Sequence, residues 1–314
     1  MIRLSVVIIA VGDTIEPHCD IDELKGCLES LSTQYDPSSM EIIVPFHSGV
    51  NGIEELRGQF PRVNFLDAGE LVFRNKNGWS REHHDELRTK ATMVAQGEII
   101  SLLEDHVRPA EGWTECIVDM HQKYPYAAIG GAIENGIDQL LNWAVYFCDL
   151  GRYQNPLPFA ESPFASVVNI SYKRNALEKI RKSWSVIFNE TIINTALLER
   201  GEKIALSPDM VVYQYRLNLD YLTVLREFFV WGRSFAQGRA NSISTPTRMF
   251  LSVGSVFIPL LMIFRMTRRI IQKQKYLPVF IKSFPIILLE TISWSIGEFT
   301  GYLFSKSSGL AHAS

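Results

Sequence analysis

Two carboxylates and an imidazole occupy three consecutive positions, Glu104-Asp105-His106, directly after the apolar run from Ile99 to Leu103. Carboxylate oxygens are the donors that Mg²⁺ and Mn²⁺ prefer, and Mn²⁺ also accepts an imidazole nitrogen. A cation held at these residues could act as a Lewis acid and stabilise a departing diphosphate. The same three residues would also suit a solvated loop with ordinary charges. The pattern alone leaves both interpretations open.

The elements that must position this triplet can be predicted from the apolar pattern. The runs Val6–Val11, 41–45, 63–66 and 99–103 indicate buried strands, and 21–34 and 84–97 have helical spacing. Strands that alternate with helices predict a parallel α/β sheet with right-handed crossovers. Ligands of such sheets bind beyond the carboxyl ends of the strands. Asp13 and Glu104 both follow such ends, so we expect them at one edge of the sheet.

The stretch Gly97–Trp113, GEIISLLEDHVRPAEGW, resembles the metal-binding segment of family 2 glycosyltransferases, in which an acidic D-x-D-like triplet ends a strand. Glu104-Asp105-His106 is similar to the Glu-Asp-His version of one subgroup. Residues 4–34 resemble the family's opening strand and helix, and Arg88 matches the arginine of its A-R-N-x-G helix. Residues 294–302 are similar to those of membrane-associated, bacterial-type members. The resemblance implies the GT-A fold: a Rossmann-like, mostly parallel sheet flanked by helices, here with a C-terminal helical membrane segment.

The same resemblance implies roles for individual residues on the donor side. It assigns the nucleoside diphosphate sugar to Val11, Asp13, Arg88, Glu104 and Asp105, and the cofactor, Mn²⁺ or Mg²⁺, to Asp105 and His106. Which of the last two binds the metal stays open. Pro45–Gly49, PFHSG, replaces the family's Asp-Asp-Gly-Ser, so the carboxylate that usually reads the nucleobase is missing. The chain contains no Q-x-x-R-W motif, which favours the transfer of single sugars over polymerisation.

Glu190 is the candidate catalytic base, because the segment from Glu190 to Pro208 resembles the part of the family that carries it. Inverting transfer needs a carboxylate that deprotonates the acceptor hydroxyl as it attacks the anomeric carbon. The family usually has Glu-Asp or Asp-Asp where this chain has Asn189-Glu190-Thr191. A glutamate at this position would also suit a helix N-terminus, where the macrodipole favours negative charge.

Four further residues are expected on the acceptor or phosphate side: Trp113, Asn169, Arg233 and Arg239. The stretch 169–177, NISYKRNAL, resembles the acceptor-side motif of the family. The tryptophan would also suit the core, and the arginines would suit a solvated helix face. We expect His83 and His84 at the surface, and Gly130-Gly131 in a tight turn.

The charge is divided unevenly along the chain. Residues 1–240 carry a net charge of −9 and residues 241–314 a net charge of +6, which together give −3. This balance gives no signal for nucleic acid binding. We therefore expect a catalytic domain over 1–240 and a membrane-associated region over 241–314. The four scattered cysteines favour a reducing, cytosolic environment for the catalytic domain.

The C-terminal region contains two hydrophobic stretches, 249–264 and 283–305. The first covers only about 24 Å as a helix, less than the ~30 Å hydrocarbon core. The second carries Glu290 and Glu298, which are costly in lipid unless they face protein. Six basic residues lie between the uncharged parts: Arg265, Arg268, Arg269, Lys273, Lys275 and Lys282. Two spanning helices would put this linker outside the cell, against the positive-inside rule, so we expect a re-entrant or interfacial attachment.

The sequence thus predicts a metal-dependent, inverting and non-processive glycosyltransferase at the cytosolic face of the inner or plasma membrane. Its partners would be a nucleoside diphosphate sugar, a lipid-linked or polysaccharide acceptor of the cell envelope, and membrane lipid. One alternative is a membrane-tethered, non-catalytic nucleotide-sugar-binding or scaffold subunit. Another is a nucleotidyltransferase, which is disfavoured because no glycine-rich, lysine-containing loop follows the first strand.

Overall fold

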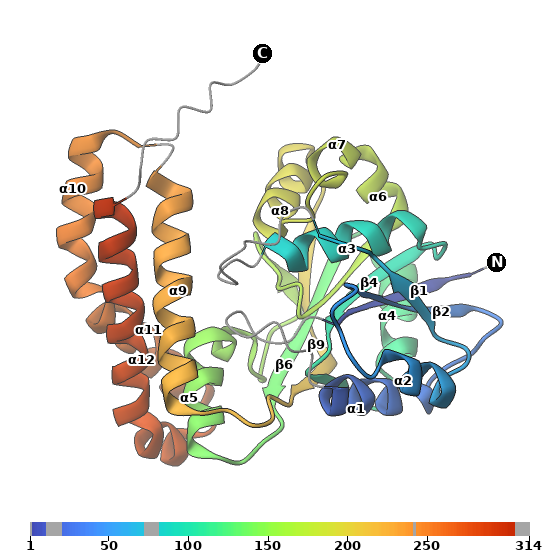
Figure 1. Ribbon diagram of the computed structural model, residues 1–314, viewed down its shortest axis with the longest axis horizontal. Coiled ribbons are helices and arrows are strands. Elements are labelled where there is room, and N and C mark those ends of the chain that lie inside the picture. Colours follow the sequence, from blue (N-terminus) through green and yellow to red (C-terminus); the bar gives the residue numbers. More distant parts are fainter. Residues whose placement is uncertain (1, 11–20, 72–81, 241–242, 305–314) are drawn as a thin grey trace. The chain divides into compact units, whose positions relative to one another are not determined.

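The computed structural model of the chain describes residues 2–10, 21–71, 82–240 and 243–304 (Figure 1). The predicted donor residues Val11 and Asp13 lie outside these ranges. The chain forms two compact units: unit 1 is Met1–Ile137 with Tyr153–Leu217, and unit 2 is Asp138–Arg152 with Asn218–Ser314. The boundaries of these two units differ from the single division at residue 240 that the composition predicts.

Within the described residues, unit 1 is built on one β-sheet that contains both parallel and antiparallel strands. Its strands are, in spatial order, β3 (Asn64–Asp67), β2 (Met40–Phe46), β1 (Leu4–Ile9), β4 (Ile99–Glu104), β8 (Asn169–Lys173), β6 (Ala128–Asn135), β9 (Ile204–Gln214) and β5 (Val107–Pro109), with β7 (Ala160–Glu161) also paired to β9. The first four run parallel, as predicted, because helices cross between them. Strand β8 is antiparallel to both of its neighbours.

The helices of unit 1 follow the predicted alternation. They are α1 (Ile21–Ser32), α2 (Ile53–Gln59), α3 (Glu82–Val94), α4 (Trp113–Lys123), α6 (Arg174–Lys179), α7 (Arg181–Trp184) and α8 (Glu190–Glu199). All residues of β1 and β4 are buried, which explains why their sequences are continuous apolar runs rather than alternating ones. Strand β4, which ends at the first residue of the acidic triplet, is therefore a buried strand between β1 and β8.

Gly130 and Gly131 lie inside strand β6, so the predicted tight turn is wrong. The pairing of β6 with β9 shifts register between Gly131 and Ala132, which marks a bulge. A Cβ atom on Gly131 would lie 2.0 Å from the Met210 carbonyl oxygen and 2.2 Å from Asn169 Nδ2. Glycine is required here because two backbones and one amide side chain meet at this point.

Unit 2 is helical. It contains α5 (Leu140–Asp149), α9 (Tyr221–Ala240), α10 (Thr245–Gly254), α11 (Ile258–Lys273) and α12 (Leu277–Phe304), with short 3-10 turns η1 (Gly151–Tyr153), which reaches into unit 1 by one residue, and η2 (Ser255–Phe257). Helices α9 and α12 pack backbone against backbone. A Cβ atom on Gly297 would lie 2.0 Å from the Phe229 carbonyl oxygen, and one on Gly232 would lie 2.2 Å from that of Trp294. This is the close approach that small residues permit between helices.

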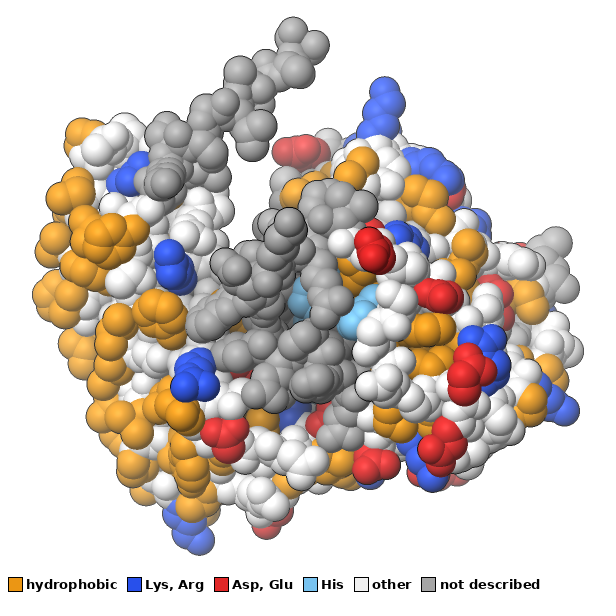
Figure 2. Space-filling view, in the orientation of Figure 1, with side chains coloured by type: hydrophobic (Ala, Val, Ile, Leu, Met, Phe, Trp, Pro, Cys, Tyr) orange, Lys and Arg blue, Asp and Glu red, His pale blue; other side chains and the backbone are white. Residues whose placement is uncertain are grey.

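Two helical runs of unit 2, Thr245–Lys273 and Leu277–Phe304, are long and apolar enough to cross a membrane. Only 22% and 33% of their most apolar windows are buried, so neither resembles the core helix of a soluble protein. Glu290 is fully buried and Glu298 is 5% exposed, so both carboxylates face protein. Figure 2 shows hydrophobic side chains gathered over the part of the chain formed by these helices.

Candidate functional site

The acidic triplet lies where strand β4 ends. Glu104 is the last residue of β4 and pairs in register with Ile9 of the parallel strand β1. Glu104 and Asp105 are both almost completely buried, and His106 is partly exposed. The predicted edge of the sheet therefore carries these groups, and a solvated surface loop is not what the structure contains here.

Arg88 of helix α3 joins this cluster. Its Nη2 atom lies 2.7 Å from Glu104 Oε1, and its Nη1 atom lies 2.8 Å from Asp85 Oδ1. The guanidinium is buried, with 3% of the side chain exposed. A buried guanidinium between two carboxylates compensates both charges and fixes the orientation of Glu104.

His106 contacts both carboxylates of the triplet. Its Nδ1 atom lies 3.2 Å from Asp105 Oδ1 and its Nε2 atom lies 3.3 Å from Glu104 Oε2. Burial by itself lowers the pKa of His106, but the hydrogen bond to Asp105 and the charges of Glu104, Asp105 and Glu23 raise that pKa to about 9. The group of carboxylates therefore creates a strongly negative site that attracts a proton or a metal cation.

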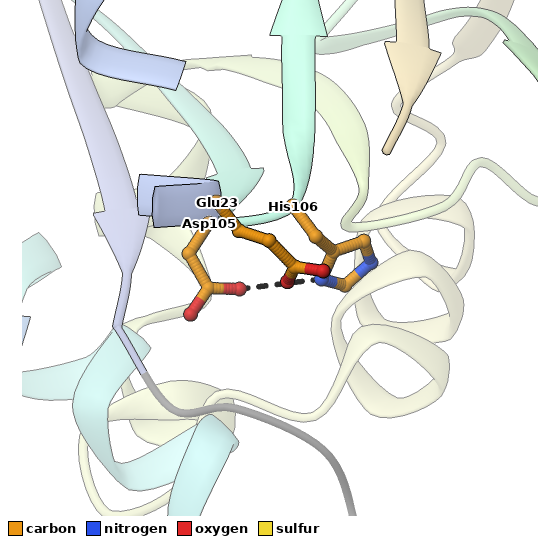
Figure 3. A group of neighbouring side chains, drawn as sticks. All are labelled: Glu23, Asp105 and His106. Atoms are coloured by element: carbon orange, nitrogen blue, oxygen red, sulfur yellow. Dashed lines mark hydrogen bonds and ion pairs between the residues drawn. The ribbon is translucent and has the colours of Figure 1, made fainter. Parts of the chain in front are cut away.

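Glu23 of helix α1 is the member of this cluster that the sequence did not reveal. One ligand atom each of Glu23, Asp105 and His106 lies within 4.8 Å of the others (Figure 3). The Leu217 backbone N–H donates to Glu23 Oε1, which holds the carboxylate in place. The sequence did contain a signal for it, because Glu23, Cys27 and Leu31 share one buried face of α1. A carboxylate on a buried helix face is costly unless it binds a partner.

These donors fit a divalent cation. Two carboxylates and one imidazole give hard oxygen ligands with a nitrogen that Mn²⁺ tolerates better than Mg²⁺. Glu104 and Arg88 lie directly beside them and could orient the ligands. Asp105 and His106, the predicted metal ligands, are thus adjacent in space, although their binding of a metal stays a prediction.

Trp113 and Asn169 contact each other rather than an open surface. Trp113 Nε1 donates to Asn169 Oδ1 over 3.1 Å, and the Asn169 amide nitrogen donates to the Ala132 and Met210 carbonyl oxygens. Both side chains are 1% exposed. They join α4 and β8 to the bulge in β6, which is a structural role. Their predicted place on the acceptor side stays a prediction.

Glu190 is the first residue of helix α8, and Asn189 is its N-cap. Glu190 Oε2 accepts a hydrogen bond from the Val167 backbone N–H over 2.9 Å. The carboxylate is half-buried and therefore held rather than freely solvated. Its role as a catalytic base stays a prediction.

The other predicted positions fall elsewhere. Arg233 and Arg239 belong to helix α9 of unit 2 and are exposed. Arg239 lies beside Glu298 and Tyr302 of the same unit.

His83 and His84 are buried, so their expected surface location is wrong. Helix α3 turns these imidazoles inward, although their polar neighbours in the sequence suggest an exposed helix.

No protein-family model and no curated protein matches this chain. Among solved structures, it is similar to the mannosyltransferase PcManGT from Pyrobaculum calidifontis in complex with GDP-Man and Mn²⁺. The TM-score is 0.56 at 13% sequence identity, covering 94% of this chain and 86% of that one. The fold is of the GT-A-like class. The predicted fold class is thereby confirmed.

A further similarity is to TarS residues 1–349 from S. aureus, solved alone and in complex with UDP-GlcNAc. The TM-score is 0.48 at 10% identity, and the alignment covers 95% of this chain and 91% of TarS 1–349.

Proposed function

We propose that this chain is a glycosyltransferase that moves a single sugar from a nucleoside diphosphate donor to a lipid-linked or polysaccharide acceptor. The observation that carries the proposal is the cluster of Glu23, Arg88, Glu104, Asp105 and His106 at the carboxyl end of β4. This is the edge at which open α/β sheets bind ligands. The similarity in fold to a mannosyltransferase solved with GDP-Man and Mn²⁺ supports the same assignment.

In this proposal Asp105 and His106 hold Mn²⁺ or Mg²⁺, with Glu23 as a third ligand. When bound, such a cation supplies positive charge that stabilises the diphosphate as it leaves. Arg88 keeps Glu104 oriented toward the donor, because its guanidinium pairs with Glu104 at 2.7 Å. Membership of family 2 and dependence on a metal are parts of this proposal.

Glu190 is the proposed base. It takes the proton of the acceptor hydroxyl while that oxygen bonds to the anomeric carbon and the bond from this carbon to the diphosphate oxygen breaks. Attack opposite the leaving group inverts the anomeric configuration. The hydrogen bond from Val167 N–H fixes the carboxylate, which favours the alignment that in-line attack needs.

Attachment to the cytosolic face of a membrane is the second part of the proposal. The exposed side chains of helices α10, α11 and α12 and of the turn η2 are largely apolar and include Phe250, Val253, Phe257, Leu260 and Phe264. Glu290 and Glu298 face the interior of unit 2, so neither carboxylate would contact lipid. The basic residues near the turn between α11 and α12 would meet anionic headgroups, at about 1 kcal/mol each.

The test is nucleotide binding followed by transfer, with the full chain in detergent. Nucleoside diphosphates are screened with and without Mn²⁺ for thermal stabilisation. A ligand at 100 times its dissociation constant adds ~2.7 kcal/mol. We expect Asp105→Ala to lose the Mn²⁺-dependent stabilisation.

Glu190→Gln should keep that stabilisation but lose transfer by about 10²- to 10⁴-fold, because the amide still accepts from Val167 N–H but takes no proton. Glu199→Gln at the opposite end of α8 is the matched control. Full activity in both Asp105→Ala and Glu190→Gln would refute the mechanism. Binding without turnover on any acceptor would favour a nucleotide-sugar-binding subunit instead.

A further inference from the structure

Asp85 of helix α3 bridges the two halves of the candidate site. Its Oδ1 atom accepts from Arg88 Nη1 at 2.8 Å, and its Oδ2 atom accepts from Asn189 Nδ2 at 3.3 Å. The backbone carbonyl of Asp85 also accepts from the Phe188 N–H at 3.2 Å. One residue of α3 thus contacts both the arginine that holds Glu104 and the segment that leads into α8.

The contact with Asn189 matters because Asn189 caps helix α8. Its Oδ1 atom accepts from the Thr191 and Ile192 backbone N–H groups, at 3.1 and 3.3 Å. The amide of Asn189 therefore faces the helix with its oxygen and Asp85 with its nitrogen. This arrangement fixes where α8 begins, and Glu190 is the first residue of that helix.

We propose that Asp85 is a positioning residue that fixes the location of Glu190 relative to the donor site. The connection runs from Glu104 through Arg88 and Asp85 to Asn189, and every contact in it is a hydrogen bond or ion pair within unit 1. The inference rests on the proposed function, since it assigns Asp85 to the alignment of that base with the donor. Asp85 itself touches neither substrate nor metal in this proposal.

A reciprocal exchange tests the inference. In Asp85→Asn, Oδ1 can still accept from Arg88, but an NH₂ group now faces the NH₂ group of Asn189. Asn189 must either lose this contact, which frees its amide to leave the helix N–H groups, or rotate its amide and lose the cap on α8. Adding Asn189→Asp restores both interactions, because the new carboxylate accepts from the amide introduced at position 85 with one oxygen and from the helix N–H groups with the other.

Two measurements are made on the full chain. Amide hydrogen exchange at Thr191 and Ile192 reports the cap: we expect faster exchange in Asp85→Asn and recovery in the double variant. Steady-state transfer reports alignment: we expect kcat to fall about ten- to a hundredfold in the single variant and to recover in the double. The KM for the donor and the dissociation constant for a nucleoside diphosphate with Mn²⁺ should not change.

Glu178→Gln is the control, since Glu178 forms an exposed ion pair with Arg181 at the same i,i+3 spacing as Asp85 and Arg88. Unchanged exchange in Asp85→Asn, or faster exchange with wild-type kcat, would overturn the positioning role. Failure of the wild type to bind any nucleoside diphosphate overturns the proposed function instead, and with it the role of Asp85 in transfer. The exchange data still decide whether the hydrogen-bonded connection exists.

Discussion

At the scale of single residues, buried charge dominates the candidate site. Arg88 is enclosed with two carboxylates, Asp85 and Glu104, and its removal would leave both without this partner in a poorly solvated environment. Breaking a buried pair is far more costly than breaking an exposed one, because the remaining charge keeps its desolvation penalty.

We therefore expect Arg88→Met to lower the free energy of unfolding by about 3–5 kcal/mol. The matched change Arg181→Met removes the exposed pair with Glu178 and should cost at most about 1 kcal/mol. Denaturant unfolding of the full chain measures both. Equal losses in the two variants would contradict a buried, energetically coupled Arg88.

His121 provides a pH test at a second buried residue. Burial, followed by the charge of Lys173, lowers the pKa of His121 to about 3, so the folded chain holds it neutral. Its contribution to stability is complete above the unfolded pKa of about 6.5 and is lost as the pH falls toward 3.

Between pH 6.5 and pH 5, wild type should lose about 1.6 kcal/mol more unfolding free energy than His121→Gln, because the slope rises from half of 1.36 kcal/mol per pH unit at pH 6.5 to almost the full value at pH 5. Unfolding titrations at the two pH values give this difference directly. Parallel pH profiles for wild type and His121→Gln would show that His121 titrates normally in the folded chain.

At the scale of elements, glycines decide how closely strands and helices approach. The bulge in β6 brings Gly131 against Met210 and lets Asn169 donate to carbonyl oxygens of both β6 and β9. In unit 2, Gly297 and Gly232 play the equivalent part between α9 and α12.

Gly131→Ala should destabilise the chain by about 3 kcal/mol, the upper end of typical overpacking, because the Cβ atom would meet a backbone oxygen that cannot rotate away. Gly58→Ala is the matched control: no atom lies within 4 Å of its added Cβ, and it lies in helix α2. That control should gain up to about 1 kcal/mol from helix propensity. Thermal or denaturant unfolding compares the two, and a tolerated Gly131→Ala would mean that the two strands can separate.

At the scale of the whole molecule, the two units have different surfaces. The Thr245–Lys273 run contains 29 residues, about 44 Å as a helix, so it is longer than the uncharged stretch 249–264 suggested. The length of this run therefore does not exclude that it spans a membrane. The argument against spanning is the positive charge of the segment between the two runs. A turn at Gln274 and Tyr276, both with positive φ, separates the two runs, and basic residues cluster around it.

We expect this basic turn to stay on the same membrane face as unit 1. A cysteine at the exposed position Gln272 should react with a membrane-impermeant reagent only from the cytosolic side of sealed vesicles. The control is Ile270→Cys, two residues earlier: this position is buried, so the introduced cysteine should give no signal from either side. Labelling of Gln272→Cys exclusively from the outside would establish two spanning helices and exclude the interfacial attachment.

The sequence by itself determined the parallel strands, the helices between them and the acidic triplet, and the resemblance to a known family added Arg88. Continuous apolar runs mark buried strands, and ligands of parallel sheets gather where those strands end. It also located both apolar helical runs of unit 2. These features depend on local pattern, which a single chain displays directly.

Only the tertiary structure decided which distant residues share a site or a face. Glu23 lies 82 positions before Asp105 in the chain and meets it because α1 packs against β5, the strand that follows the triplet. Asp85 reaches Asn189 across 104 positions, Glu290 and Glu298 turn away from the apolar surface, and Gly131 lies in a strand rather than a turn. Each of these outcomes depends on packing between elements that are far apart in the chain, and the local spacing of residue types does not predict such packing.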